Sequence, residues 1–151
     1  MRPDRVMKIA RIDRDLPPGF DALLVAATSE GVRNMQLLAH SWRSGEQRFA
    51  DDGEALFGAF DGEQLIGVGG VTHEAGLPEP AMRMRRFYVL PQARGMGAGR
   101  ELAESAMTHG FAQAALLTCN ARATPFAAPF WEAMGFRRED LPNITHICRK
   151  G

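Results

Sequence analysis

The sequence has little cysteine and no excess of charge of either sign. Cys119 and Cys148 are the only two cysteines, and they lie far apart without CxxC or Cys/His ligand spacing. This argues against a disulfide framework and a zinc site, so we expect no metal and two thiols in a reducing compartment. The 18 basic and 18 acidic side chains cancel. A dedicated nucleic-acid or membrane-surface binder would be strongly basic, so we expect neither as a partner.

Long apolar runs are also missing. No stretch of ~20 consecutive apolar residues occurs, so we expect no membrane span. No apolar segment follows a basic start, so we expect no secretory leader and a cytoplasmic protein. The 151 residues fit one domain spanning residues 1–151. At that length roughly 70% of the unfolded chain's surface can be buried, so the hydrophobic core can be stable without disulfide cross-links.

Helix and strand patterns alternate along the chain without a strict repeat. Mixed patterns of this kind predict an α/β (α+β) domain, a sheet with helices packed on its faces. A hairpin is expected at Asp61-Gly62, and a turn at Pro142-Asn143. We predict strands at 6–13, on both sides of Asp61-Gly62 within 54–73, at 81–90, 114–119 and twice within 136–150, and helices at 20–31, 32–45, 99–111 and 124–136.

The glycine-rich stretch "RGMGAG" at residues 94–99 stands between a predicted strand and a predicted helix. A phosphate loop of nucleotide hydrolases is excluded, because Arg100-Glu101 follows where Lys-Ser or Lys-Thr is needed. A dinucleotide fingerprint is disfavoured by the G-x-G-x-G spacing and by the position late in the chain. Two interpretations stay open. One is a nest of backbone N–H groups for an anion, flanked by Arg94 and Arg100, and the other is a glycine turn without a ligand.

Two motifs carry a resemblance to a known family. The stretch 94–99 with "FYVLP" before it resembles motif A of the GCN5-related N-acetyltransferase (GNAT) superfamily. Downstream, Asn120 and the segment "FWEAMGF" at 130–136 are similar to motif B of the same superfamily. The predicted order of elements also resembles the family fold. The resemblance implies a single GNAT-like domain whose mixed, mostly antiparallel central sheet is splayed at an acyl-CoA site and has helices on both faces.

The resemblance also implies a donor substrate and the residues that bind it. The donor would be acetyl-CoA. Its pantetheine arm would pair with the backbone of Phe87, Tyr88 and Val89 as an added strand. Asn120 would form a hydrogen bond either to the pantetheine or within the splayed part of the sheet that admits the pantetheine. Phe126, Phe130 and Trp131 would wall the thioester end, with plain core packing as the alternative for Phe130 and Trp131. The pyrophosphate would lie on the N–H groups of Arg94, Gly95, Met96, Gly97, Ala98, Gly99 and Arg100.

The implied chemistry is direct transfer of an acetyl group to a primary amine. His73 and Glu74 are candidate bases, and solvated loop residues are the alternative. The family often places a tyrosine in the motif B helix as the acid for the CoA thiolate. Trp131 or Phe130 occupies that place here, and neither can supply a proton. Tyr88 is the only tyrosine and is expected to face away from the thioester, so no acid is assigned.

The acceptor side is the least specified part of the sequence. We expect a small-molecule or peptide amine, and a homodimer is compatible with the family. Trp42 shares a helical stripe with Met35 and Leu38, which favours the core over an acceptor contact. Two other functions stay open: a non-catalytic acyl-CoA-binding sensor or regulatory module, and an interaction domain whose glycines are structural.

Overall fold

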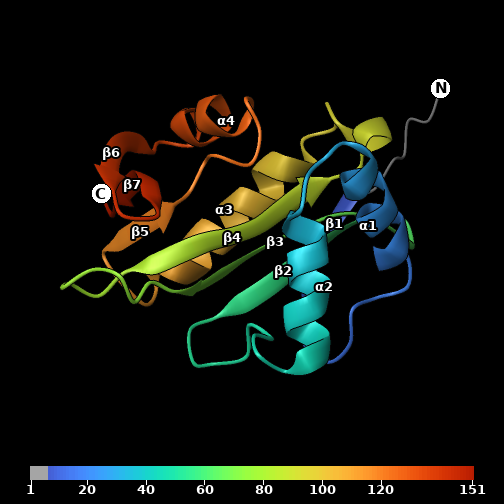
Figure 1. Ribbon diagram of the computed structural model, residues 1–151, viewed down its shortest axis with the longest axis horizontal. Coiled ribbons are helices and arrows are strands. Elements are labelled where there is room, and N and C mark those ends of the chain that lie inside the picture. The colour runs from blue at the N-terminus through green and yellow to red at the C-terminus, as the bar shows by residue number, and fades with distance from the viewer. Residues whose placement is uncertain (1–6) are drawn as a thin grey trace.

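The computed structural model describes residues 7–151, and its strands form one mixed sheet (Figure 1). The sheet has seven strands in the order β1-β2-β3-β4-β5-β7-β6. Every pair is antiparallel except β4–β5, which is parallel. This confirms the predicted fold class. The strands are β1 Met7–Ile12, β2 Ala55–Asp61, β3 Gln64–His73, β4 Met82–Val89, β5 Leu116–Cys119, β6 Arg137–Leu141 and β7 Ile144–Arg149. Val6, part of the predicted first strand, lies outside the described residues.

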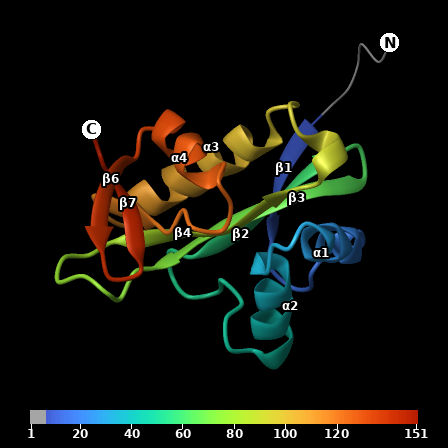
Figure 2. The ribbon, with the colours of Figure 1, turned by 45° about the horizontal axis from the view of Figure 1, so that its top comes forward.

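Helices cover both faces of the sheet (Figure 2). Helices α1 (Phe20–Ser29) and α2 (Asn34–Ser44) lie on one face, and α3 (Ala98–Phe111) and α4 (Ala127–Ala133) lie on the other. A single 3-10 turn, η1 (Pro91–Ala93), joins β4 to the loop before α3. Helix α4 is shorter than the predicted 124–136. Its Pro129 lies in the first turn, where a missing N–H costs no helical hydrogen bond.

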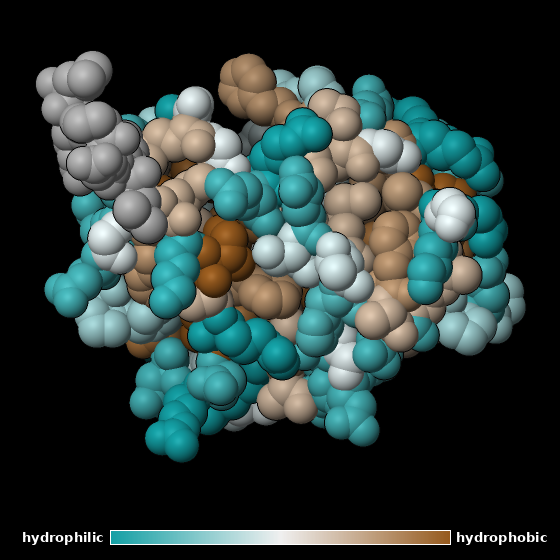
Figure 3. Space-filling view, turned by 180° about the vertical axis from the view of Figure 1, so that it is seen from behind, coloured by the Kyte–Doolittle hydropathy of each residue, from teal (hydrophilic) through white to brown (hydrophobic). Residues whose placement is uncertain are grey.

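Buried apolar side chains form hydrophobic clusters on both faces of the sheet. The α2 stripe of Met35, Leu38 and Trp42 is buried on the first face, as its spacing predicts. On the other face, Ala103 and Ala106 of α3 pack with Trp131 of α4. Apolar side chains on the back of the molecule lie in patches that hydrophilic side chains interrupt (Figure 3). Within residues 7–151, no helix is long and apolar enough to cross a membrane.

The sheet opens between β4 and β5. These strands pair only at Met82↔Leu117 and Arg83↔Thr118. Beyond Arg83, β4 stays on β3, whereas β5 continues along β7 through Cys119↔His146. Within residues 7–151, the remaining length of β4 therefore has no strand partner on its β5 side, which confirms the predicted splay.

A β-bulge lies in this unpaired part of β4. Arg86 and Phe87 together oppose one residue of β3, Gly69, because the register passes from Gly70↔Arg85 to Val68↔Tyr88. Arg86 has φ 61°, which is uncommon for a bulky side chain. A Cβ on Gly69 would come within 2.4 Å of the Phe87 ring, so only glycine leaves room for that ring. The bulge thus turns Phe87 towards α3 and α4, and Tyr88 towards α1.

Candidate functional site

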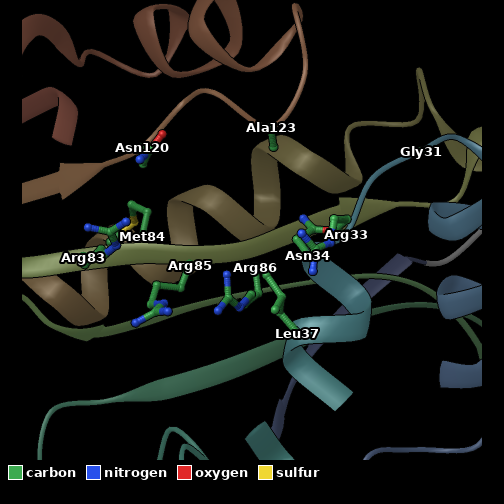
Figure 4. A pocket seen from close by; sticks show the side chains of 10 residues that line it. All are labelled: Gly31, Arg33, Asn34, Leu37, Arg83, Met84, Arg85, Arg86, Asn120 and Ala123. Atoms are coloured by element: carbon green, nitrogen blue, oxygen red, sulfur yellow. The ribbon is translucent and has the colours of Figure 1, made fainter. Parts of the chain in front are cut away.

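A cavity of about 390 Å³ lies beside the open edge of β4 (Figure 4). Three segments that are far apart in the sequence form its wall. They are the α1–α2 turn with the start of α2, the middle of β4, and the chain after β5. In Figure 4, Arg85 and Arg86 extend to the side of β4 that holds Leu37, whereas Met84 extends towards Asn120. The lining residues are Gly31, Arg33, Asn34, Leu37, Arg83, Met84, Arg85, Arg86, Asn120 and Ala123.

The glycine stretch forms the loop between η1 and α3. Gly95 and Gly97 both have φ 88°, and a Cβ on either would meet nothing within 4 Å. Gly97 is the N-cap of α3, and no side chain caps this end. Helical bonding begins with Glu101 N–H donating to the Gly97 carbonyl. The N–H groups of the first turn, together with the helix dipole, therefore suit an anion. The backbone geometry fits the predicted nest, and the anion it would hold stays a prediction.

The two arginines that flank this loop already have carboxylate partners. Arg94 donates to both oxygens of Glu30, at 2.9 and 2.7 Å, and its Nε donates to the Val89 carbonyl at 3.2 Å. Arg100 donates to Glu104, one helical turn away, at 3.1 Å. The positive potential of the nest therefore comes chiefly from the backbone. The other predicted loop residues divide by burial: Ala98 is buried, Met96 and Gly99 are half-buried, and Gly95 and Gly97 are exposed.

Tyr88 belongs to a network that ties α1 to this loop. Its hydroxyl donates to Glu30 at 2.5 Å, and the Arg94 guanidinium lies over its ring, 5.5 Å from the centroid. The hydrogen bond from Arg94, and then that from Tyr88, lowers the pKa of Glu30 to about 2. Burial, and then the Glu30 carboxylate, raises the pKa of Tyr88 to about 12. Tyr88 thus packs in the core on the α1 side, away from the cavity, and holds its proton at neutral pH.

Aromatic side chains pack on the α4 side of the opening. The Trp131 ring meets Phe87 edge to face at a centroid distance of 4.8 Å, and it meets Phe130 and Phe136 at 5.0 Å each. Trp131 is only 5% exposed, so these contacts agree with core packing. Phe130 is half-buried beside the first turn of α3, where a Cβ on Gly99 would lie 3.5 Å from its ring. Phe126, by contrast, is 80% exposed.

Asn120 follows β5 directly, where the two strands part. Its Nδ2 donates to the Asn143 carbonyl at 3.2 Å, and its Oδ1 accepts from the Arg122 N–H at 3.1 Å. These bonds fix the chain after β5 to the turn between β6 and β7. The arrangement suits the predicted role in holding the splay, and a bond to a ligand stays a prediction.

The two candidate bases lie at the far end of β4 from the bulge, and neither lines the cavity. His73 is exposed, with its Nε2 2.6 Å from the Asp52 carbonyl. Glu74 is half-buried and accepts hydrogen bonds from Thr118 Oγ1 at 2.8 Å and Arg83 Nη1 at 3.2 Å. Burial raises the pKa of Glu74, but the bonds from Thr118, Gly76 and Arg83 outweigh it and leave the pKa lowered. Glu74 thus reaches the cavity only through Arg83.

Sequence reasoning missed the residues that line most of the cavity. The run "RMRR" at 83–86 carries a signal, because three arginines in a strand that must pack on both faces are unusual. Asn34 carries no such signal. Its Nδ2 donates to the Phe87 carbonyl at 2.8 Å across 53 residues of chain, and its buried Oδ1 has no hydrogen-bond partner among the described residues.

An open β4–β5 edge next to a glycine nest is the arrangement that the GNAT motifs imply, and the comparison with known proteins agrees. The family model described as "Acetyltransferase (GNAT) domain" matches residues 24–148. The chain belongs to the GNAT acetyltransferase family. A domain of this family carries out acyl transfer. No curated protein matches the chain. Within residues 7–151, no group of three or more His, Cys, Asp or Glu side chains is placed to hold a metal ion.

Solved structures of the same fold are numerous. A predicted acetyltransferase from Exiguobacterium sp. 255-15 is 28% identical with a TM-score of 0.84, over 95% of this chain and 93% of that one. A GNAT family acetyltransferase from Elizabethkingia anophelis, solved with acetyl-CoA bound, is 13% identical with a TM-score of 0.65, over 95% and 97%. The IAA acetyltransferase from Bacillus cereus is 21% identical with a TM-score of 0.62, over 89% and 79%. At their lower identities, the last two show the fold alone.

The Glu30 network predicts a pH-dependent stability. Because the pKa of Glu30 is depressed in the folded state, its contribution is complete above the unfolded value of 4.5 and is lost as pH falls towards about 2. We expect Glu30→Gln to lower the free energy of unfolding at pH 7 by up to about 1 kcal/mol, since the pair is partly exposed. Urea denaturation from pH 7 to pH 2.5 measures the difference, which should shrink below pH 4.5.

The control is Glu104→Gln, which removes the exposed pair with Arg100. We expect a change too small to resolve at either pH. A Glu30→Gln deficit that stayed constant down to pH 2.5 would contradict the assignment of the network.

Proposed function

We propose that this protein transfers an acetyl group from acetyl-CoA to a primary amine of a small-molecule or peptide acceptor. The observation that carries the proposal is the parting of β4 from β5 beside the glycine nest of α3. The family assignment supports acyl transfer in general. Acetyl-CoA is supported as the donor by the Elizabethkingia relative, which was solved with it. A cytoplasmic location and a homodimer remain part of the proposal.

The donor would lie along the open edge of β4. Its pyrophosphate would meet the N–H groups from Arg94 to Arg100, and the open space above Gly95 and Gly97 leaves room for it. Its pantetheine would follow the backbone of Phe87, Tyr88 and Val89, where no strand occupies the β5 side. The described residues suit acetyl-CoA best at the glycine loop and along β4. Phe130 borders the same opening, whereas Trp131 is a core residue and Phe126 points into solvent.

The reaction joins the acceptor nitrogen to the acetyl carbon. As that C–N bond forms, the C–S bond breaks and its electron pair stays on the CoA sulfur. The proton lost by the amine ends on that thiolate or on water. N–H groups at the bulge near Phe87 would polarise the thioester carbonyl in the manner of an oxyanion hole.

Among the described residues, no side chain of the opening would be placed to protonate the thiolate. Trp131 is buried among aromatic rings, and the Tyr88 hydroxyl is bonded to Glu30 on the other face. We propose that water protonates the thiolate, because a thiol is already acidic enough to leave without a strong acid. A base role for His73 or Glu74 would then require a water chain from the end of β3, since neither lines the cavity.

Thiol release tests the activity. The protein with acetyl-CoA is offered a broad panel of primary amines, and release of free CoA thiol is measured from pH 6 to pH 9. We expect release with a subset of the amines. In the same assay, unchanged pH–rate profiles of His73→Ala and Glu74→Ala would remove both residues as bases.

The alternative function, a non-catalytic acyl-CoA sensor, is favoured by the absence of a proton donor at position 131, where Trp131 stands. The amine panel distinguishes a sensor from an enzyme. A sensor would bind acetyl-CoA and release no thiol with any amine. Binding itself is measured by thermal shift, since a ligand at 100 times its Kd stabilises the folded protein by ~2.7 kcal/mol. No shift with CoA or acetyl-CoA would instead favour a domain whose glycines are structural.

The nest predicts a charge effect at Gly97. Asp at this position should weaken acetyl-CoA binding by about tenfold or more, because a carboxylate would face the pyrophosphate. Isothermal titration calorimetry measures the Kd. The matched control is Gly97→Asn, which has the same shape, tolerates a positive φ and adds no charge. Equal affinities of the Asp and Asn variants would rule out a pyrophosphate at this loop.

A further inference from the structure

The cavity beside β4 has a strongly basic wall. Of the ten described residues that line it, four are arginines and none is acidic. This concentration is local, because the chain as a whole has equal numbers of basic and acidic side chains. Arg33 stands at the start of α2, and Arg83, Arg85 and Arg86 follow one another along β4 (Figure 4).

Most of this charge has no partner. Arg83 is paired with Glu74 at 3.2 Å. Among the described residues, the guanidinium groups of Arg33, Arg85 and Arg86 form no hydrogen bond and no ion pair. Arg85 and Arg86 are half-buried, so they lose part of their hydration, and no described carboxylate lies within ion-pair distance of either guanidinium. An anionic ligand would supply the missing partner.

The arginines also repel one another. Burial lowers the pKa of Arg85, and the charge of Arg83 lowers it further, while Glu74 and Glu54 partly offset both. Burial, and then the charges of Arg85 and Arg83, lowers the pKa of Arg86 to about 10. Both groups remain charged at neutral pH. A bound anion would relieve the repulsion and so would bind more tightly than at an isolated arginine.

The backbone of β4 directs this charge to the cavity. Arg86 is the first of the two bulge residues and has φ 61°, a conformation that a bulky side chain rarely adopts. Without the extra residue, the regular alternation along β4 would place residue 86 on the same face as Met84. With it, Arg85 and Arg86 extend to the same side, towards Leu37 (Figure 4).

Arg85 and Arg86 lie apart from the place of the donor's phosphates. The nest follows the end of β4, whereas Arg86 and Arg85 lie three and four residues before Val89, about 10 to 13 Å along an extended strand. If the thioester meets the bulge, as the proposed function requires, the arginines line the space beyond the acetyl group. That space belongs to the acceptor.

A polar group for the acceptor nitrogen lies in the same cavity. The Oδ1 of Asn34 is buried and without a partner among the described residues, and its Nδ2 is fixed on the Phe87 carbonyl. Because neighbouring atoms cover this oxygen, an amine N–H would reach it only after a small side-chain shift, and would then supply its missing partner. A cavity of about 390 Å³ suits a small molecule rather than a folded protein.

We propose that the acceptor is a small amine that also carries an anionic group, held by Arg85 and Arg86 while its nitrogen donates to Asn34. This inference rests on the proposed acetyl transfer. The bond changes are the same: the acceptor nitrogen bonds the acetyl carbon, the C–S bond breaks, and the amine proton passes to the thiolate or to water. The anion takes no part in these changes and serves to orient the amine. A carboxylate and a phosphate share the required chemistry.

Matched acceptors test the proposal and separate the two anions. The carboxylate arm compares α-amino acids with their amides, and the phosphate arm compares O-phosphoethanolamine with ethanolamine. We expect the anionic member of the preferred arm to have a kcat/KM at least about tenfold higher. Arg85→Gln and Arg86→Gln should each remove most of that preference and leave the Kd of acetyl-CoA unchanged. The control is Arg14→Gln, an exposed arginine outside the cavity, which should keep the preference. Neutral members that react as well, or a preference that survives both variants, would overturn the proposal.

A binding measurement keeps this test independent of turnover. The protein saturated with CoA, so that the nest is filled, is titrated with glutarate and with inorganic phosphate, and the Tm is followed. We expect at least one anion to raise the Tm of the wild-type protein and of Arg14→Gln, but not of Arg85→Gln. No rise with either anion overturns the anionic acceptor. A rise without thiol release from any amine overturns the acetyl transfer and leaves the anion site standing.

Discussion

The early parting of β4 from β5 is the constraint on which the rest of this structure depends. The two strands share only the pairs at Met82 and Arg83, yet each remains bonded on its other side. β4 therefore carries an open edge inside the domain rather than at its border. The Phe87 and Val89 carbonyls accept bonds from Asn34 and Arg94, so an added extended chain would pair chiefly with backbone N–H groups of this edge. The glycine loop then places the N-terminus of α3 at the end of the same edge.

Contacts from the first two helices hold β4 in this position. Asn34 at the start of α2 bonds the Phe87 carbonyl, and Glu30 at the end of α1 binds both Tyr88 and Arg94. The bulge opposite Gly69 sends Phe87 to one face and Tyr88 to the other. The short α1–α2 turn therefore has a role beyond connecting two helices. It fixes the strand that would carry the thioester.

Periodicity and turn chemistry were enough to predict the helices and strands, whereas the opening of the sheet was expected only from the resemblance to the GNAT family. The Asp61-Gly62 hairpin, the strand ending at Pro91 and the burial of Trp42 all follow from local spacing, and the structure confirms them. The cavity could not be predicted in this way, because its wall joins Asn34, Arg86 and Asn120 from three separate segments. Even Arg94, correctly placed at the loop, has a guanidinium bound to Glu30, 64 residues earlier in the chain. Contacts of this range depend on the packed fold and leave no local pattern.

The nest at the end of β4 would then bind the donor, and the arginine-lined cavity beside β4 would bind the acceptor. The nest at α3 draws its potential from backbone dipoles, and the cavity draws its charge from side chains, with Arg83 held in place by Glu74. Their separation along β4 would keep donor and acceptor from competing for one site. The roles proposed for the nest, for the edge of β4 and for the cavity all require that acyl-CoA lie along the open edge of β4.

Amide hydrogen exchange with and without acetyl-CoA tests that requirement most directly. We expect slower exchange at Phe87–Val89 and at Gly95–Arg100 in the presence of acetyl-CoA, with little change along β1 and β2. Protection confined to other elements, with β4 and the glycine loop unchanged, would contradict it.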